Sequence, residues 1–178
     1  MNQAMITLGG GCFWCLEGVY SNMRGIISAL SGYMGGAHPN PSYEAVCTGT
    51  TGHAEVVQLG YDTTQTNLND ILQVFFSIHD ATTLNRQGND IGTQYRSVIY
   101  YHDETQKNIA SQTIVALQTQ LTQPVVTELS PASTFYPAED YHQNYFAHHP
   151  QQGYCRAVVA PKIAKFAHYF PQWVNSRA

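Results

Sequence analysis

The chain has 178 residues, a length that fits one domain with its own hydrophobic core. Hydrophobic residues make up 43% of it, which is typical of a globular protein and excludes a disordered chain. The net charge is −4 with only 8 lysines and arginines, so we predict no nucleic-acid partner. Residues 1–8 lack the features of a secretion signal, and no apolar run approaches the roughly 20 residues of a membrane span. We therefore expect a cytoplasmic protein without a membrane partner, and a monomer.

Hydrophobic periodicity predicts a series of short strands and helices. Residues 5–8 form an apolar strand that ends at three glycines, residues 12–20 have helical spacing, and residues 26–33 form a second strand. Residues 54–61 alternate as a third strand, and residues 67–79 form an amphipathic helix. A strand at 97–101 and a long helix at 104–122 follow, and Pro124 prevents that helix from continuing. A strand at 125–129 and helices at 140–148 and 161–170 complete the chain.

The first six predicted elements follow the order β-α-β-β-α-β, which is typical of a split βαβ, or ferredoxin-like, core. A doubly wound parallel sheet would need a helix between residues 33 and 54, where only a brief segment at 41–46 is available. We therefore predict the α+β class, a two-layer sandwich within a single domain at 1–178. Its ferredoxin-like core spans about 4–129, and an irregular C-terminal segment spans about 130–178.

A cysteine, Cys12, follows the three glycines at the start of the first predicted helix. A helix N-terminus exposes unpaired N–H groups and a positive dipole end, so we expect it to lower the pKa of this thiol. Cys12 is therefore a candidate nucleophile. The two large rings beside it, Phe13 and Trp14, indicate an apolar wall around a small substrate group.

Cys12 and Cys15 also form a C-x-x-C pair, which leaves other hypotheses open. Such a pair is typical of a thiol-disulfide oxidoreductase or of half a zinc site. Zinc needs a second half, and the sequence has no other C-x-x-C, so we predict no metal and no cofactor. His142, His148 and His149 are interpreted as exposed polar residues on a terminal helix. A non-catalytic domain that binds a metal or a peptide is the third hypothesis.

The candidate acid is Glu55, which shares one face of the predicted strand 54–61 with Val57, Leu59 and Tyr61. A carboxyl group on an apolar face loses hydration, so its pKa rises. If it is protonated near neutral pH, it can serve as a general acid. The alternative is that Glu55, at the beginning of its strand, is simply solvated.

The two long glycine-rich connections, residues 34–53 and 80–94, carry or adjoin three further candidates: Tyr43, Asp90 and Tyr95. Connections this long inside a compact domain are usually functional. Phenol groups donate directional hydrogen bonds without carrying charge, which suits the binding of a polarised oxygen. Cys155 lies in a flexible tail segment, from which it could approach Cys12 or remain inert.

Five separated segments together resemble peptide methionine sulfoxide reductase A. They are Gly11-Cys12-Phe13-Trp14, residues 43–55, residues 90–97, residues 141–145 and Tyr154-Cys155. The likeness extends from about residue 6 to residue 166. The resemblance implies reduction of the S epimer of methionine sulfoxide, free or in proteins, and hence the repair of oxidised proteins.

The resemblance also implies roles, position by position. Cys12 would attack the sulfoxide sulfur, leaving methionine and a sulfenic acid on Cys12. Glu55 would protonate the sulfoxide oxygen, and the oxygen would accept hydrogen bonds from the phenols in the two loops, Tyr43 and Tyr95. The methyl group would be enclosed by the two rings after Cys12, Phe13 and Trp14, and Asp90 would join the polar network of the site.

The family uses a resolving cysteine, which forms a disulfide that thioredoxin then reduces. Cys155 matches the position of that cysteine, and no cysteine follows it in the chain. Cys15 is the alternative, although a disulfide between Cys12 and Cys15 within one helical turn is sterically demanding. Cys47 is interpreted as structural.

Overall fold

A computed structural model describes residues 2–176 as one six-stranded sheet covered by helices. The sheet order is β7-β6-β1-β3-β2-β8, and every neighbouring pair is antiparallel except β6 and β7, which are parallel. A separate two-stranded hairpin joins β4 and β5. The strands are β1 (Gln3–Gly9), β2 (Ile26–Met34), β3 (Ala54–Asp62), β4 (Arg86–Gln87), β5 (Asp90–Ile91), β6 (Val98–Tyr101), β7 (Glu128–Pro131) and β8 (Tyr136–Pro137).

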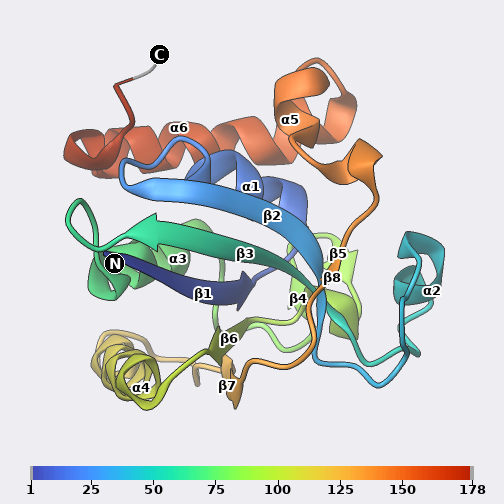
Figure 1. Cartoon of the computed structure of the whole chain (residues 1–178), viewed down its shortest axis with the longest axis horizontal. Coiled ribbons are helices and arrows are strands. Elements are labelled where there is room, and N and C mark those ends of the chain that lie inside the picture. The colour runs from blue at the N-terminus through green and yellow to red at the C-terminus, as the bar shows by residue number, and fades with distance from the viewer. Residues whose placement is uncertain (1, 177–178) are drawn as a thin grey trace.

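Six α-helices and one π-helix connect and cover the strands (Figure 1). The predicted mixture of helices and strands around one sheet is therefore confirmed. No helix among residues 2–176 is long and apolar enough to cross a membrane. The helices are α1 (Phe13–Tyr20), α2 (Tyr43–Cys47), α3 (Leu68–Ile78), α4 (Glu104–Gln118), α5 (Tyr145–His148), the π-helix (Cys155–Val159) and α6 (Ala160–Tyr169).

The main hydrophobic core lies between one face of the sheet and the helices α1, α3, α4 and α6. Alternation along β1 and β3 places Ile6 and Leu8 beside Leu59 and Val57, in register, on this face. Two of these helices, α3 and α4, begin at side-chain caps, where Asn67 accepts from the N–H of Asp70 and Asp103 accepts from that of Gln106. Burial of this face at about 25 cal/mol per Å² of apolar surface is the main stabilising contribution to the fold.

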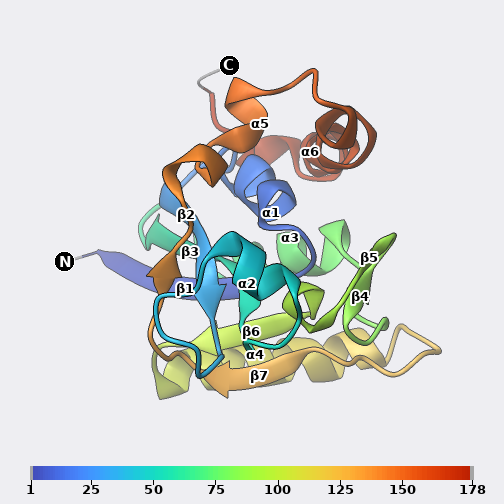
Figure 2. The ribbon, with the colours of Figure 1, turned by 90° about the vertical axis from the view of Figure 1, so that its right-hand side faces the viewer.

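The functional end of the sheet is where β1 ends and β3 begins. In Figure 1 the α2 segment and the β4–β5 hairpin, which belong to the two long connections, gather at this end. Figure 2 shows the same end from the front, with α5 and α6 on the side of α1. The first residues of β3 pair with the end of β2, Glu55 with Tyr33 and Ala54 with Met34, and β3 pairs with β1 from Val57 onward.

The C-terminal part differs most from the sequence-based predictions. The single helix predicted at 140–148 is wrong, because Asn144 has a left-handed backbone (φ 53°) that separates a 3₁₀ turn, Asp140–His142, from α5. Cys155 does not lie in a flexible tail, since it begins the π-helix that leads into α6 and is fully buried. The predicted bounds of two other elements also shift, because α4 already ends at Gln118 and β7 begins only at Glu128.

Candidate active site

Cys12 is held at the start of α1 by a sharp turn after β1. Gly11 has φ 90°, a conformation that favours glycine, and its N–H donates to the carbonyl of Tyr95 at 3.2 Å. Cys12 is the N-cap of α1 with an extended backbone, and its carbonyl accepts from the N–H of Cys15 at 3.1 Å. Cys12 as a residue is half-buried and lines a hollow, so a substrate can reach it.

Glu55 lies directly beside this helix start. Its side chain is 1% exposed, and Oε1 accepts a hydrogen bond from the N–H of Phe13 at 3.1 Å. Burial raises the pKa of Glu55 to about 8, the charge of Asp90 also raises it, and the hydrogen bond from Phe13 opposes this. The predicted elevated pKa follows from the position of Glu55 on the buried face of β3, and the carboxyl group holds its proton at neutral pH.

The pKa of Cys12 differs from the prediction. Burial raises it well above its ordinary value, and the charges of Glu55 and Cys15 raise it further. The backbone N–H of Trp14 lowers it, as expected for a helix start, but this effect is smaller than the loss of hydration. Before substrate binds, both the thiol and the carboxyl group are therefore protonated at neutral pH.

Two phenols face the same carboxyl group from the two long connections. Tyr43 begins α2, which Ser42 caps by accepting from the N–H of Ala45, and Tyr95 ends a 3₁₀ turn at Thr93–Tyr95. Burial raises the pKa of both phenols, and the charge of Glu55 adds to each shift. Both side chains are half-buried and remain hydrogen-bond donors over the whole physiological pH range.

Aromatic rings enclose the space beside Cys12. The Phe13 ring contacts those of Tyr33 and His142, with centroids 5.8 and 5.1 Å away. Trp14 stacks in parallel on Tyr145 at a centroid distance of 3.7 Å, and its indole N–H donates to His142 Nδ1 at 3.1 Å. The predicted pair of rings thus forms walls whose second layer comes from the C-terminal segment.

Asp90 and Tyr154 close the opposite side of the Cys12 thiol. The Tyr154 hydroxyl donates to Asp90 Oδ2 at 2.6 Å and lies 3.9 Å from Cys15 Sγ. Because Tyr154 immediately precedes the π-helix, this contact joins the β4–β5 hairpin to the segment that carries Cys155. Asp90 therefore belongs to a polar network beside Cys12.

All four cysteines are free thiols, and three of them form one cluster. Cys155 is 0% exposed and Cys15 is 1% exposed, and both pack in an apolar cluster that Cys12 and Trp14 border. Cys47 is exposed on α2, so the interpretation of Cys47 as a structural cysteine has no support from burial.

Sequence reasoning missed the buried position of His142 among the rings beside Cys12. The prediction of an exposed surface histidine is wrong for this residue, which is 2% exposed and lies between the rings of Phe13, Trp14 and Tyr43. Since its Nδ1 accepts from Trp14, the proton is on Nε2. His148 and His149 are exposed, as expected, and residues 2–176 contain no group of three side chains placed to hold a metal ion.

Two further side chains that the sequence did not single out attach the C-terminal segment to the core. The buried Glu17 of α1 accepts from the hydroxyl of Ser31 at 2.5 Å and from the N–H of Asn144. Gln143 binds both backbone groups of Ser31, accepting from its N–H at 3.1 Å and donating to its carbonyl at 2.9 Å. The signal was present only as polar residues within apolar surroundings. The two contacts that reach the C-terminal segment, Glu17 with Asn144 and Gln143 with Ser31, join residues more than 100 positions apart.

A thiol at a helix start, a protonated carboxyl group beside it and a surrounding aromatic wall define a cysteine-dependent enzyme. Residues 4–173 match the family model "Peptide methionine sulfoxide reductase". The chain belongs to this family and is an enzyme of this type.

Individual relatives are similar to this chain over most of its length. Peptide methionine sulfoxide reductase MsrA of Polynucleobacter asymbioticus is 60% identical over 90% of this chain and 85% of its own length. The reduced form of Saccharomyces cerevisiae Mxr1 superposes with a TM-score of 0.82 at 35% identity, covering 86% of this chain and 90% of that chain. Mxr1 in complex with Trx2 shares the fold at a TM-score of 0.59 and 24% identity, over 81% and 85% of the two chains.

Proposed function

We propose that the protein reduces the S epimer of methionine sulfoxide, free or within proteins, and that thioredoxin restores the enzyme. The observation that carries this proposal is the hydrogen bond that ties the protonated Glu55 carboxyl group to the helix start beside the Cys12 thiol. A sulfoxide oxygen departs from sulfur only after it gains a proton, so the reaction requires an acid and a nucleophile together. Family membership supports the same substrate.

In the first step the Cys12 sulfur attacks the sulfoxide sulfur. The oxygen then passes to the Cys12 sulfur, so a sulfur–oxygen bond forms on Cys12 while the transient sulfur–sulfur bond and the sulfur–oxygen bond of the substrate break. The carboxyl group of Glu55 gives its proton to the oxygen, and the thiol proton replaces it on Glu55. The oxygen leaves as the hydroxyl of a sulfenic acid on Cys12, and methionine is released. The sulfoxide sulfur gains the two electrons that Cys12 loses, and Glu55 ends the step protonated.

The raised pKa of Cys12 fits this exchange, because the thiol gives up its proton only when an acceptor is present. As Glu55 transfers its own proton to the oxygen, it becomes that acceptor. Tyr43 and Tyr95 donate hydrogen bonds to the developing charge on the oxygen. Their half-buried phenols near the Glu55 charge support these roles.

The remaining side chains bind the substrate. Phe13 and Trp14 enclose the methyl group, and the fixed indole of Trp14, stacked on Tyr145 and hydrogen-bonded to His142, supports a rigid wall. Asp90, with Tyr154, contributes the polar network at the mouth of the site. A wall that is already ordered before binding reduces the entropy that must be lost when the sulfoxide enters.

The sulfenic acid is then resolved by Cys155. The Cys155 thiol attacks the Cys12 sulfur, a disulfide forms and the sulfenic hydroxyl leaves as water. Membership of both cysteines in one cluster with Cys15 supports this step, and Cys15 is the alternative resolving thiol. A thioredoxin dithiol then reduces the disulfide by thiol exchange, in line with the complex known for the relative Mxr1.

We propose that the chain functions as a single-domain monomer in the cytoplasm. Four free thiols support a reducing compartment. The antiparallel strand order β6-β1-β3-β2 supports a ferredoxin-like core, and residues 130–178 would form the segment that carries the resolving cysteine.

The experiment is an assay of purified protein with the separate S and R epimers of methionine sulfoxide. With dithiothreitol as reductant, the S epimer alone should be converted, and Cys12→Ser should abolish conversion. With thioredoxin as reductant, the wild type and Cys15→Ser should turn over repeatedly. Loss of turnover in Cys15→Ser would favour the Cys12–Cys15 oxidoreductase instead, and conversion of neither epimer would contradict the proposal.

A further inference from the structure

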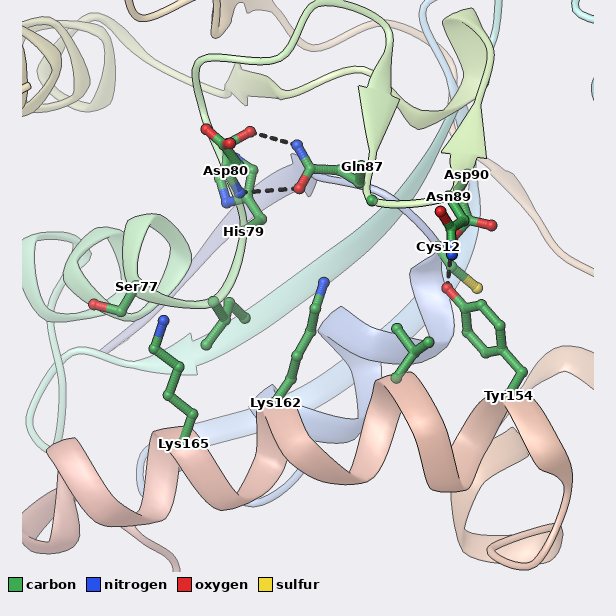
Figure 3. A pocket seen from close by; sticks show the side chains of 13 residues that line it. Cys12, Ser77, His79, Asp80, Gln87, Asn89, Asp90, Tyr154, Lys162 and Lys165 are labelled. Atoms are coloured by element: carbon green, nitrogen blue, oxygen red, sulfur yellow. Dashed lines mark hydrogen bonds between the residues drawn. The ribbon is translucent and has the colours of Figure 1, made fainter. Parts of the chain in front are cut away.

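A hollow of about 560 Å³ opens on the side of Cys12 that faces α6 (Figure 3). One wall is the face of the C-terminal helix that carries Lys162 and Lys165, and the other wall comes from the end of α3 and the β4–β5 hairpin. Asp90 and Tyr154 lie at the Cys12 end. None of the groups proposed for the sulfur chemistry lies beyond that end, so the rest of the hollow has no role in the steps above.

The C-terminal wall is positively charged, although the chain is poor in basic residues. Lys162 and Lys165 are two of the three lysines in the chain. They lie one helical turn apart on the same face of α6. Lys162 is half-buried, and among residues 2–176 neither ammonium group makes an ion pair or a hydrogen bond. A partly dehydrated cation without a partner attracts an anion.

Two carboxylates also line the hollow, but each already accepts hydrogen bonds from the protein. Asp80 Oδ1 accepts from the N–H and the hydroxyl of Thr82, at 2.9 and 2.6 Å. Asp90 Oδ2 accepts from the Tyr154 hydroxyl at 2.6 Å. Neither carboxylate lies within ion-pair distance of the lysines, so a ligand that follows α6 meets positive charge.

We propose that this hollow binds an acidic side chain of the polypeptide that carries the methionine sulfoxide, and so favours acidic substrates. The inference rests on the proposed function. The hollow runs from the Cys12 end along the face of α6 that carries the two lysines, and this favours an acidic segment of the substrate polypeptide as the occupant.

The spacing sets the position of that acidic residue. Lys162 follows Tyr154 by eight positions, which corresponds to about 12 Å along a helix. An extended peptide covers about 3.3 to 3.6 Å per residue, so the acidic side chain would lie about three or four residues from the sulfoxide. Free methionine sulfoxide is too short to reach the lysines.

The test uses peptides with one methionine S-sulfoxide and either aspartate or asparagine three or four positions away, on each side. With dithiothreitol as reductant, the wild type should show a kcat/KM about three- to tenfold higher for one aspartate peptide than for its asparagine match, mainly through KM. Lys162→Gln with Lys165→Gln should abolish that difference, as should 0.5 M salt, which screens exposed charges. The matched control, Lys107→Gln on α4, should retain it.

Lys162→Glu is a second variant, and its expected result is a reversed peptide preference rather than a lost one. It should reverse the preference, so that a lysine peptide is reduced faster than the aspartate peptide.

The proposal would be overturned if the ratio of kcat/KM for the aspartate peptide to that for the asparagine peptide were equal in the wild type and the double lysine variant. It would also be overturned by a double variant that keeps its peptide preference but has a raised KM for thioredoxin, since the hollow would then serve the reductant. Free methionine S-sulfoxide should be reduced equally by all variants; its loss in the wild type would contradict the proposed function instead.

Discussion

The Glu55 carboxylate accepts a 3.1 Å hydrogen bond from the backbone N–H of Phe13, the residue that follows Cys12. Glu55 is therefore positioned relative to Cys12 by the backbone of a helix start. Glu55 is fixed in turn by its place in β3, where it pairs with Tyr33 of β2. The Glu55 carboxyl group and the Cys12 thiol are thus held by β3 and by the start of α1.

Glu55→Gln should lower kcat for S-sulfoxide reduction by a factor on the order of a hundred or more, because it removes the proton that the oxygen must gain. KM should change little, since the amide keeps the size of the side chain and can still accept from Phe13. Steady-state kinetics with dithiothreitol measure both constants. Glu44→Gln, an exposed glutamate on α2, is the control and should match the wild type. Unchanged kcat in Glu55→Gln would remove the acid role.

The same variant should change the pH dependence of stability. The pKa of Glu55 is about 8 in the folded protein and near its ordinary value, 4.5, when unfolded. Between these values the unfolded chain loses a proton that the folded protein keeps, so the stabilising contribution of protonated Glu55 is lost as pH rises towards 8. Urea unfolding from pH 5 to 8 should show the wild type losing about 2 to 4 kcal/mol relative to Glu55→Gln. If the free energy of unfolding changed with pH in the same way in the wild type and in Glu55→Gln, Glu55 would not be shielded from water.

Cys155→Ser should stop the reaction before the disulfide. One equivalent of S-sulfoxide should then leave Cys12 as a sulfenic acid, and turnover with thioredoxin should fall at least tenfold. Cys15→Ser should still form a Cys12–Cys155 disulfide, which peptide mapping by mass spectrometry identifies. Cys47→Ser is the control, because its thiol is exposed and lies outside the cluster of the other three. A Cys12–Cys15 disulfide in the wild type would assign resolution to Cys15.

Glu17→Ala should loosen the C-terminal segment from α1. The substitution removes the acceptor of both Ser31 and Asn144, so we expect a loss of about 1 to 3 kcal/mol in the free energy of unfolding. His142 and Tyr145 belong to the same C-terminal segment and contact Trp14. Loosening this segment should therefore also raise KM for the sulfoxide. Glu104→Ala, in the first turn of α4, should cost less than 1 kcal/mol and leave KM unchanged. An unchanged KM in Glu17→Ala would show that the hydrogen bonds of Glu17 to the C-terminal segment do not affect substrate binding.

Local patterns were sufficient for one half of the site. Alternation along β3 predicts that Glu55 points to the same buried side as Val57, because residues two apart in a strand share a face. The glycine turn likewise predicts a helix that starts near Cys12. Both features depend on residues within one or two elements, which periodicity describes well.

The other half depends on contacts between distant segments. Nothing near Asn144 in the sequence indicates that Glu17 accepts its N–H and that the helix therefore breaks there. The burial of Cys155 in the π-helix depends on its packing beside Cys15. The raised pKa of Cys12 has the same origin, since its cause is the burial that the assembled site imposes and not the helix end alone.

The central claim is that the Cys12 sulfur takes the sulfoxide oxygen while Glu55 supplies the proton. Its most direct test is a single turnover by a protein in which Cys15, Cys47 and Cys155 are replaced by serine. One equivalent of methionine S-sulfoxide should yield one methionine and one dimedone-reactive sulfenic acid on Cys12, and Glu55→Gln should slow both products equally. Methionine formed without modification of Cys12 would contradict the claim.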